Sequence, residues 1–151
     1  MKNIAIIGTG LAALRAGLEI AKNKETNLTF WEKSPSVGGR VATRRLESQF
    51  INHGTTKFDN FDVIINLDQV ASKFGPFLDF SGGATRLPKA MRDEINKLSS
   101  GIQWNFNKKI TKITLDGKLE SEENLFEYDA ILITAPLPQA EELLAQKFAF
   151  P

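Results

Sequence analysis

The sequence predicts an α/β fold with a central parallel sheet, because its first part runs in the order strand, glycine turn, helix, strand and acid. An apolar run, Ile4–Ile7, leads into the turn Gly8-Thr9-Gly10, and helical periodicity continues from Leu11 to Lys22. A second apolar run, Leu28–Trp31, ends on Glu32. A helix that joins two parallel strands through a glycine turn is typical of a Rossmann-like dinucleotide-binding unit.

Each small residue of the turn has a physical role in this interpretation. Gly8 allows the chain to leave the strand sharply, and Gly10 lets a pyrophosphate approach the backbone because it has no Cβ. Ala13 stands where a third glycine often does, and it is small enough for close packing of helix and strand. The first N–H groups of the helix and its dipole favour an anion at the same place.

The acid at the end of the second strand completes the pattern. Glu32 follows Gly10 by 22 residues, close to the expected spacing of about 20, and its carboxylate can accept hydrogen bonds from ribose hydroxyls. The competing interpretation is a helix that merely begins in a glycine-rich turn. Since strand, helix and acid all stand in register, nucleotide binding is favoured.

The remainder of the chain alternates between further strands and helices, with turns between them. Asp116-Gly117 is a strong hairpin signal, and residues 120–124 read as a polar tip. The pattern leaves residues 40–45 open between a short helix and an extended segment. Strands are predicted for residues 50–54, 102–106, 110–115 and 128–134, and helices for residues 62–74, 85–98 and 138–146.

Composition excludes several classes of function. The chain has 151 residues, enough for one domain, and a net charge of +1 with no basic stripe, so nucleic acid is not expected as a partner. It has no cysteine and one histidine, which excludes disulfides, thiolate metal sites and a multi-histidine metal centre. A structural role is favoured for that histidine, His53. No apolar stretch approaches the roughly 18 residues that suggest a membrane span, so we expect a soluble, cytoplasmic protein.

A second glycine loop, Gly38-Gly39-Arg40, begins six residues after Glu32. Its two glycines again allow close backbone approach, here beside a cation. A guanidinium can bind a pyrophosphate through two hydrogen bonds, so the loop could fold back over the same dinucleotide. The competing interpretation is a Gly-Gly turn followed by a surface arginine.

With these motifs the sequence resembles the flavin-containing amine oxidase superfamily, and within it the renalase-like branch. The resemblance reaches nearly the whole chain in family order. It is carried by five stretches: Ile4–Ala13, Trp31–Arg40, Asn52–Phe58, Gly82–Met91 and Asp129–Leu144.

The resemblance implies an FAD/NAD(P)-binding domain with a flanking helix layer and a β-hairpin or meander crossover, holding FAD noncovalently in an extended form. By this resemblance the glycine turn would cradle the pyrophosphate, Glu32 would hold the adenosine ribose, Gly54-Thr55 would lie near the flavin and Ile110 would meet the adenine through its backbone. The cofactor-binding residues expected on this basis are Gly8, Gly10, Leu11, Ala12, Ala13, Glu32, Lys33, Gly39, Arg40, Gly54, Thr55 and Ile110.

The chain also departs from the family pattern. Family members are longer and leave the cofactor domain twice to build a substrate domain. Here the first excursion, residues 59–80, is shortened, and the second would begin after Leu144. We therefore expect a single domain, residues 1–151, with most of the substrate domain missing. Its apolar tail, Phe148–Pro151, suggests a truncated product or a surface for self-association or a partner chain.

The function expected from this resemblance is an FAD-dependent oxidoreductase that transfers a hydride from a C–N or dihydropyridine substrate to the flavin. The partners would be a small-molecule substrate and NAD(P)H. Because the cofactor carries the chemistry, the sequence names no catalytic residue and no metal ligand. The alternatives are a non-catalytic dinucleotide-binding module that needs a partner chain and, disfavoured by the second glycine loop, an NAD-dependent dehydrogenase.

Overall fold

A computed structural model describes residues 1–47, 49–54, 69–71, 78–80, 82–114, 116–122 and 124–145. Within this part, four parallel strands form the central sheet in the order β11-β1-β2-β7. The predicted α/β class with a central parallel sheet is therefore confirmed. The strands are β1 (Lys2–Ile7), β2 (Thr26–Glu32), β7 (Ile102–Phe106) and β11 (Ala130–Ile133).

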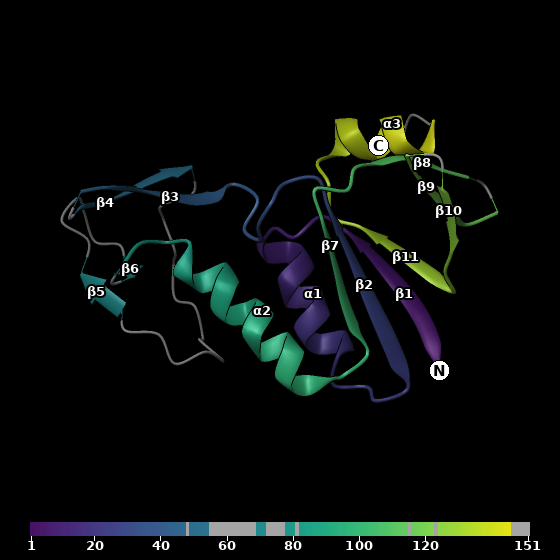
Figure 1. Ribbon diagram of the computed structural model, residues 1–151, viewed down its shortest axis with the longest axis horizontal. Helices are drawn as coiled ribbons and strands as arrows, with labels where there is room; N and C mark the ends of the chain where they lie inside the picture. Colours follow the sequence, from purple (N-terminus) through teal and green to yellow (C-terminus); the bar gives the residue numbers. More distant parts are fainter. Residues whose placement is uncertain are drawn as a thin grey trace, which may run out of the picture.

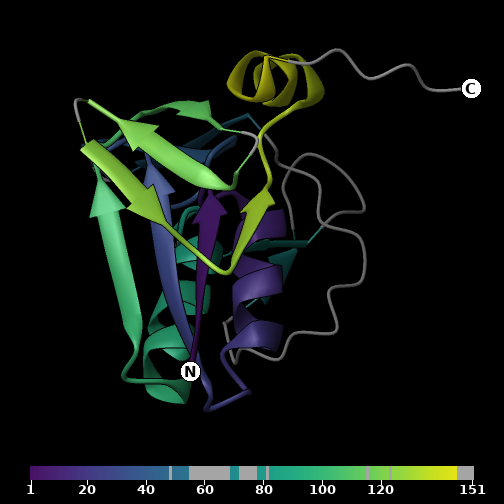
Figure 2. The same cartoon turned by 90° about the vertical axis from the view of Figure 1, so that its right-hand side faces the viewer.

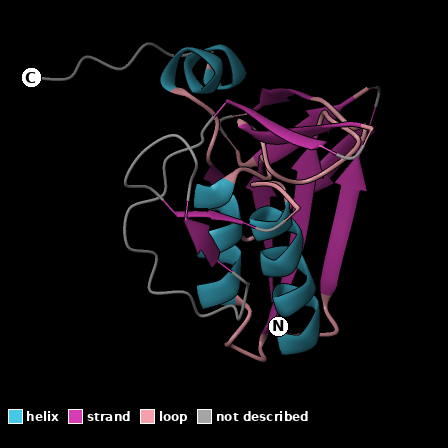
Figure 3. Ribbon diagram, turned by 90° about the vertical axis from the view of Figure 1, so that its left-hand side faces the viewer, coloured by secondary structure: helices cyan, strands magenta, loops and turns pink. Residues whose placement is uncertain are grey.

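The sheet lies in the middle of three layers. The helices α1 (Leu11–Ile20) and α2 (Arg86–Leu98) cover one face, as Figures 1 and 3 show. An antiparallel meander of β8 (Ile110–Ile113), β9 (Lys118–Ser121) and β10 (Asn124–Glu127) lies on the other face. The last helix, α3 (Leu137–Leu144), contacts β8 and lies beyond the carboxyl ends of the parallel strands (Figure 2).

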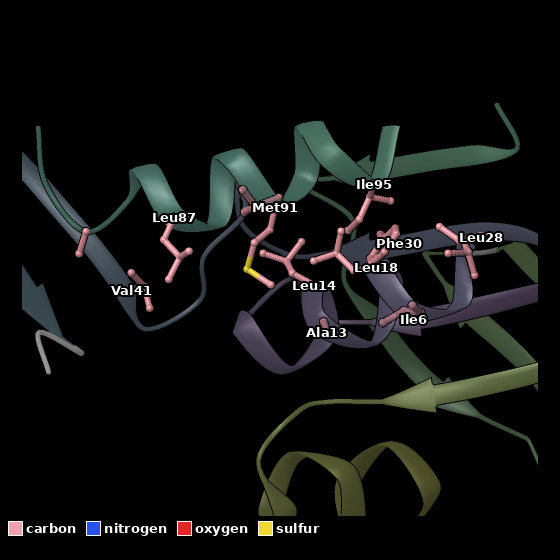
Figure 4. Packing of buried hydrophobic residues seen from close by; sticks show 13 residues of the cluster. Ile6, Ala13, Leu14, Leu18, Leu28, Phe30, Val41, Leu87, Met91 and Ile95 are labelled. Carbon is pink, nitrogen blue, oxygen red and sulfur yellow. The ribbon is translucent and has the colours of Figure 1, made fainter. Parts of the chain in front are cut away.

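The core between helices and sheet follows from the helical spacing of apolar side chains (Figure 4). Leu14 and Leu18 of α1 are buried four residues apart, so one stripe of that helix faces the sheet. From α2, Met91 and Ile95 pack on the same core at the same spacing. In the sheet, Phe30 is fully buried, and its ring stacks on Trp104 of β7 with centroids 4.0 Å apart.

A second core lies between the sheet and the meander. Trp31 of β2 is buried there with Ile7 of β1, Ile110 of β8 and Leu119 of β9. The indole N–H of Trp31 donates to the hydroxyl of Tyr128 at 3.1 Å. Because successive strand residues point to opposite faces, Phe30 fills the helix side and Trp31 the meander side. Both faces of β2 are thus covered, as expected for a parallel sheet.

Two hairpins lie outside the main sheet. β3 (Val41–Leu46) pairs with β4 (Gln49–Gly54), so residues 40–45, which the sequence left open, are extended from Val41 onward. β5 (Gln69–Ala71) pairs with β6 (Leu78–Phe80). The predicted helix over residues 62–74 is therefore wrong at 69–71, where a strand partner fixes the chain in extended form. The rest of that prediction lies outside the described residues.

The meander also corrects a turn prediction. Residues 120–124 were expected to form a polar tip, but Glu120 and Ser121 end β9, and β10 already begins at Asn124. Glu122 adopts a positive φ of 57°, which reverses the chain in fewer residues than polarity suggested. The expected turn at Asp116-Gly117 is present, with the Gly117 N–H donating to the carbonyl of Thr114 at 3.0 Å.

Candidate functional site

The candidate site is the edge of the parallel sheet at the carboxyl ends of its strands. The segments that leave β1, β2, β7 and β11 all begin at this edge. From β1 the chain proceeds outward to β2 and β7, whereas β11 adds to the opposite side of β1. The strand order thus reverses between β1 and β11, and open α/β sheets bind ligands outside the strand ends at such a point.

Gly8, the first residue of the glycine turn, is required by the fold itself. Its φ is +101°, and a Cβ there would lie 2.7 Å from Oγ1 of Thr134, which follows β11. That hydroxyl donates to the carbonyl of Ile7 at 2.8 Å, so the chain after β11 is attached to the end of β1. Glycine is therefore needed at position 8 for the backbone conformation, as the sequence predicted, and also for packing against Thr134, which the sequence did not predict.

At position 10, neither the backbone conformation nor packing against the described residues requires a glycine. Its φ of −69° and ψ of 175° suit any L-residue. A Cβ built on it would meet nothing within 4 Å. The absence of a side chain thus leaves open space in front of the backbone where α1 begins. No side chain caps that helix and its first turn holds no acid, so neither a cap nor an acid of the helix occupies its first N–H groups.

The other predicted residues of α1 differ in exposure. Ala12 is exposed and Leu11 is half-buried, so the backbone at both positions is near the surface. Ala13 is fully buried in the helix–sheet core. Its small side chain serves the close packing of helix and sheet that the sequence predicted.

The second glycine loop lies directly against the first. The Gly38 N–H donates to the carbonyl of Thr9 at 2.9 Å. A Cβ on Gly39, whose φ is +56°, would lie 3.2 Å from the Cα of Gly10. The two loops therefore meet backbone to backbone, and a side chain on Gly39 would crowd the first loop.

Two cations lie at the surface in this region, Arg40 at the end of the second glycine loop and Lys33 directly after Glu32. Arg40 and Lys33 are both exposed. Within the part of the chain described, neither makes an ion pair or a side-chain hydrogen bond. Both are therefore available to an anion outside the chain.

Glu32 is buried, with 7% of its surface exposed, and its carboxylate organises the turn. Oε2 accepts hydrogen bonds from the Thr9 N–H at 3.0 Å and the Thr9 hydroxyl at 2.7 Å. Oε1 accepts from the Ser34 N–H at 2.8 Å. Since each oxygen accepts a backbone N–H, a glutamine amide would turn its NH₂ towards a donor in either orientation. The site thus requires a carboxylate even before any ligand is considered.

The segment after β7 joins the same cluster. Lys108 N–H donates to the carbonyl of Glu32 at 3.0 Å, and Asn107 N–H donates to the carbonyl of Ser34 at 3.2 Å. These bonds hold the chain just before Ile110 against the end of β2. The Ile110 side chain itself is buried in the sheet–meander core. Its expected backbone contact with adenine stays a prediction.

The β3–β4 hairpin begins directly at the second glycine loop. Gly54 has a φ of +101° and pairs with Val41, and a Cβ there would overlap the carbonyl of Arg40. Gly54 is therefore needed for the hairpin to close beside Arg40. His53 is exposed on β4. Thr55, expected near the flavin, lies outside the described residues.

Sequence reasoning missed Thr9, which is fully buried and bonds to Glu32 and Gly38. Two features of the sequence could have indicated this role. Thr9 is a hydroxyl residue between Gly8 and Gly10, and the neighbouring strand β2 ends on an acid, Glu32. Among the described residues no cluster of three metal-ligating side chains occurs. Two surface hollows lie away from the glycine loops, one beside Trp31 and Tyr128 and the other beside Asn27 and Gly101.

Comparison with known proteins gives the same fold. Residues 6–73 match the family model of the NAD(P)-binding Rossmann-like domain, a segment that contains both glycine loops and Glu32. No curated protein sequence matches the chain. Among the described residues no helix is long and apolar enough to cross a membrane.

Solved structures resemble the chain at low sequence identity. A provisionally assigned protoporphyrinogen oxidase from Exiguobacterium sp. 255-15 is 12% identical with a TM-score of 0.74 and covers 95% of this chain. An oxidoreductase from Methanosarcina mazei is 9% identical with a TM-score of 0.73 and covers 97%. CtdE, solved with FAD and a substrate, is 15% identical with a TM-score of 0.53 and covers 91%.

The chain spans 61%, 62% and 38% of the length of these three proteins, in the same order. The resemblance to the renalase-like branch of the amine oxidases stays a prediction. The sheet order, the glycine turn and the matches together identify the fold of this chain as a Rossmann-like domain, with a central parallel sheet flanked by helices.

Proposed function

We propose that the chain binds FAD noncovalently along the carboxyl edge of its sheet and forms the cofactor-binding part of an FAD-dependent oxidoreductase. The observation that carries the proposal is Gly10. It needs no positive φ, and among the described residues no atom lies within 4 Å of the position that its Cβ would take. An uncapped helix end and a neighbouring glycine loop border that space, which is the environment that a diphosphate requires.

The diphosphate half of the site would use backbone groups and two cationic side chains. The N–H groups of Leu11 and Ala12 at the start of α1 would donate to one side of the diphosphate. Gly39 would allow approach from the other side, and the exposed guanidinium of Arg40 would pair with a phosphate. Lys33, also exposed, would add positive charge nearby.

The adenosine half depends on the end of β2. Glu32 Oε1 holds one hydrogen bond, from Ser34, and keeps capacity to accept another from a ribose hydroxyl. The segment through Lys108, bonded to the Glu32 carbonyl, would present the backbone of Ile110 to the adenine. On the side of the diphosphate opposite to the adenosine, Gly54 and Thr55 would border the flavin.

Bound FAD supplies a flavin ring that accepts a hydride, and the resemblance to renalase-like amine oxidases points to a C–N or dihydropyridine substrate, with NAD(P)H as a second partner. The residues of this chain bind and orient the cofactor. None of them is assigned a proton-transfer role.

The direct test is the absorption spectrum of the purified chain after incubation with FAD and removal of free cofactor. We expect a retained yellow chromophore that absorbs near ~450 nm, at one flavin per chain. A chain that remains colourless at saturating FAD would contradict the proposal.

A second candidate function is a dinucleotide-binding unit that acts only with another chain. It is favoured by exposed apolar side chains on the β3–β4 hairpin, where Leu46, Phe50 and Ile51 are 57%, 51% and 44% exposed. Anaerobic bleaching of the bound flavin by candidate amines and by NADH separates the two functions. Reduction by the isolated chain supports the enzyme, and binding without reduction supports the unit that requires a partner.

A further inference from the structure

Thr9, in the first glycine turn, is hydrogen-bonded to the two other parts of the candidate site, the second glycine loop and Glu32. Its carbonyl accepts the N–H of Gly38, which holds the second glycine loop against the first. Its N–H and its hydroxyl both donate to Oε2 of Glu32, at 3.0 and 2.7 Å. The side chain is fully buried. All of these contacts are made by Thr9, the residue directly before Gly10.

The bonds to Thr9 make the two oxygens of Glu32 unequal. Oε2 accepts two hydrogen bonds from Thr9, whereas Oε1 accepts one, from the N–H of Ser34. A carboxylate oxygen has two lone-pair directions, so Oε2 is saturated and Oε1 keeps one free. Glu32 as a whole keeps 7% of its surface exposed, so the residue is not completely covered by the described part of the chain.

We infer that Thr9 is a positioning residue that makes the site specific for a nucleotide with ribose hydroxyls. Its hydroxyl fills the second acceptor position of Oε2 and, together with the backbone N–H bonds from Thr9 and Ser34, holds the carboxylate so that Oε1 accepts a hydrogen bond from the 2′- or 3′-hydroxyl. The inference rests on the proposed function, because it assigns the adenosine ribose to Glu32. It adds that recognition of the ribose depends on a threonine that does not itself touch the nucleotide.

The test compares two small ligands in the full chain: ADP, and 2′,3′-dideoxy-ADP, which lacks both ribose hydroxyls. Thr9→Val removes the hydroxyl and keeps the N–H bond and the shape of the side chain. Thr9→Ser keeps the hydroxyl and loses a methyl group. Isothermal titration gives the affinity of each variant for each ligand, and circular dichroism confirms that each variant is folded.

We expect the wild type to prefer ADP over the dideoxy ligand by about tenfold or more, the size of one charge-assisted hydrogen bond. Thr9→Val should lose most of this preference through weaker binding of ADP, with the dideoxy ligand affected less than about twofold. Thr9→Ser should keep the preference. If Thr9 has a purely structural role, Thr9→Val should lower the affinity for both ligands equally. That result would overturn the inference.

The remaining outcomes are also decisive. A Thr9→Val variant that keeps the full preference refutes the role of the hydroxyl while leaving FAD binding intact. A wild type that binds neither FAD nor ADP refutes the proposed function and the inference with it. If Thr9→Val does not fold, Thr9→Ala against Thr9→Ser gives the same comparison, because alanine also removes the hydroxyl and adds no bulk.

Discussion

Glycine is present for different physical reasons at different positions along the carboxyl edge of the sheet. Gly8 and Gly54 adopt a φ of +101°, and a Cβ on either would collide with a neighbouring segment. Gly10 has an ordinary φ and open space before it. Both kinds look alike in sequence, but only a glycine that the fold does not need has to be explained by something outside the chain.

Gly10→Ala separates folding from binding. Alanine fits the backbone conformation and meets no atom of the described residues. The gain of about 0.4–1 kcal/mol through the unfolded state is opposed by the poorer N-cap preference of alanine, so we expect stability to change by less than about 1 kcal/mol. Its methyl group would occupy the space assigned to the diphosphate, so FAD affinity should fall at least about tenfold. Urea unfolding and FAD fluorescence titration measure the two quantities.

Gly17→Ala is the matched control, in the middle of α1. A Cβ at Gly17 would lie 2.5 Å from Cζ of the buried Phe30 ring. Overpacking of about 1–3 kcal/mol should exceed the gain in helix propensity of about 1 kcal/mol. This variant should therefore lose stability and keep the FAD affinity of its folded fraction. If Gly10→Ala binds FAD as well as the wild type, the space before Gly10 is not the diphosphate site.

Arg40→Ala tests the cation of the second glycine loop. Arg40 is exposed and makes no ion pair within the described residues, so its removal should leave the stability nearly unchanged. Loss of a phosphate contact should weaken FAD binding about tenfold at low salt, with a smaller effect at high salt because exposed charges are screened.

Arg44, exposed on β3, supplies the control for this charge. Arg44→Ala removes the same charge four residues further along and should change FAD affinity less than about twofold. Equal losses in both variants would indicate general attraction of the anion by a basic surface, and would argue against a specific contact from Arg40.

At the scale of elements, the β3–β4 hairpin is attached to the start of α2 by side chains. The Thr43 hydroxyl donates to Oδ1 of Asn52 at 2.7 Å and accepts from the N–H of Thr85 at 3.1 Å. Asn52 Oδ1 also accepts from the N–H of Ala84 at 2.9 Å. These bonds satisfy the N–H groups of Ala84 and Thr85, the two residues just before α2 begins at Arg86. This attachment links the second glycine loop to the helix layer.

Thr43→Val should therefore destabilise the chain. The change removes the acceptor of the Thr85 N–H, just before α2, and the donor to Asn52, and a polar group left without its hydrogen-bond partner costs about 1–3 kcal/mol. Urea unfolding should show this decrease for Thr43→Val and little change for Thr43→Ser, which keeps the hydroxyl. Equal stability of the valine variant and the wild type would mean that the attachment contributes nothing.

The sequence predicted elements well where local pattern and tertiary environment agree. The periodicity of Leu14 and Leu18 and the apolar run of β2 both match the observed core. It failed at residues 69–71, where the strand exists because of its partner β6, and at residues 120–124, where the positive φ of Glu122 shortens the turn. Such long-range pairing and single-residue conformations leave no periodic signal.

The site shows the same limit. Spacing alone placed Gly10, Glu32 and the second loop at one edge of the sheet, because carboxyl ends of parallel strands meet there. Spacing could not reveal that Thr9 joins them, since its hydrogen bonds to Glu32 span 23 positions. Spacing also could not show that the glycine turn itself needs the carboxylate of Glu32, which accepts hydrogen bonds from Thr9 and Ser34, apart from any bond to a ribose.

At the scale of the whole molecule, a ligand that binds only the folded state raises its stability. At a concentration 100 times its dissociation constant the gain is about 2.7 kcal/mol. We expect FAD to raise the melting temperature more than NADH at equal concentration, because the β3–β4 hairpin, through Gly54, extends the proposed site beyond the diphosphate towards the flavin. A larger shift with NADH would favour the NAD-dependent alternative over the flavoprotein.

The central claim is that two glycine loops hold the diphosphate of FAD between them, and a crystal structure of the chain with FAD tests it most directly. We predict density for the diphosphate at the start of α1, in contact with the backbone of Gly10 and Gly39, and for the adenosine ribose at Oε1 of Glu32. A structure at saturating FAD in which the space before Gly10 is empty, or in which FAD binds elsewhere, would contradict the claim.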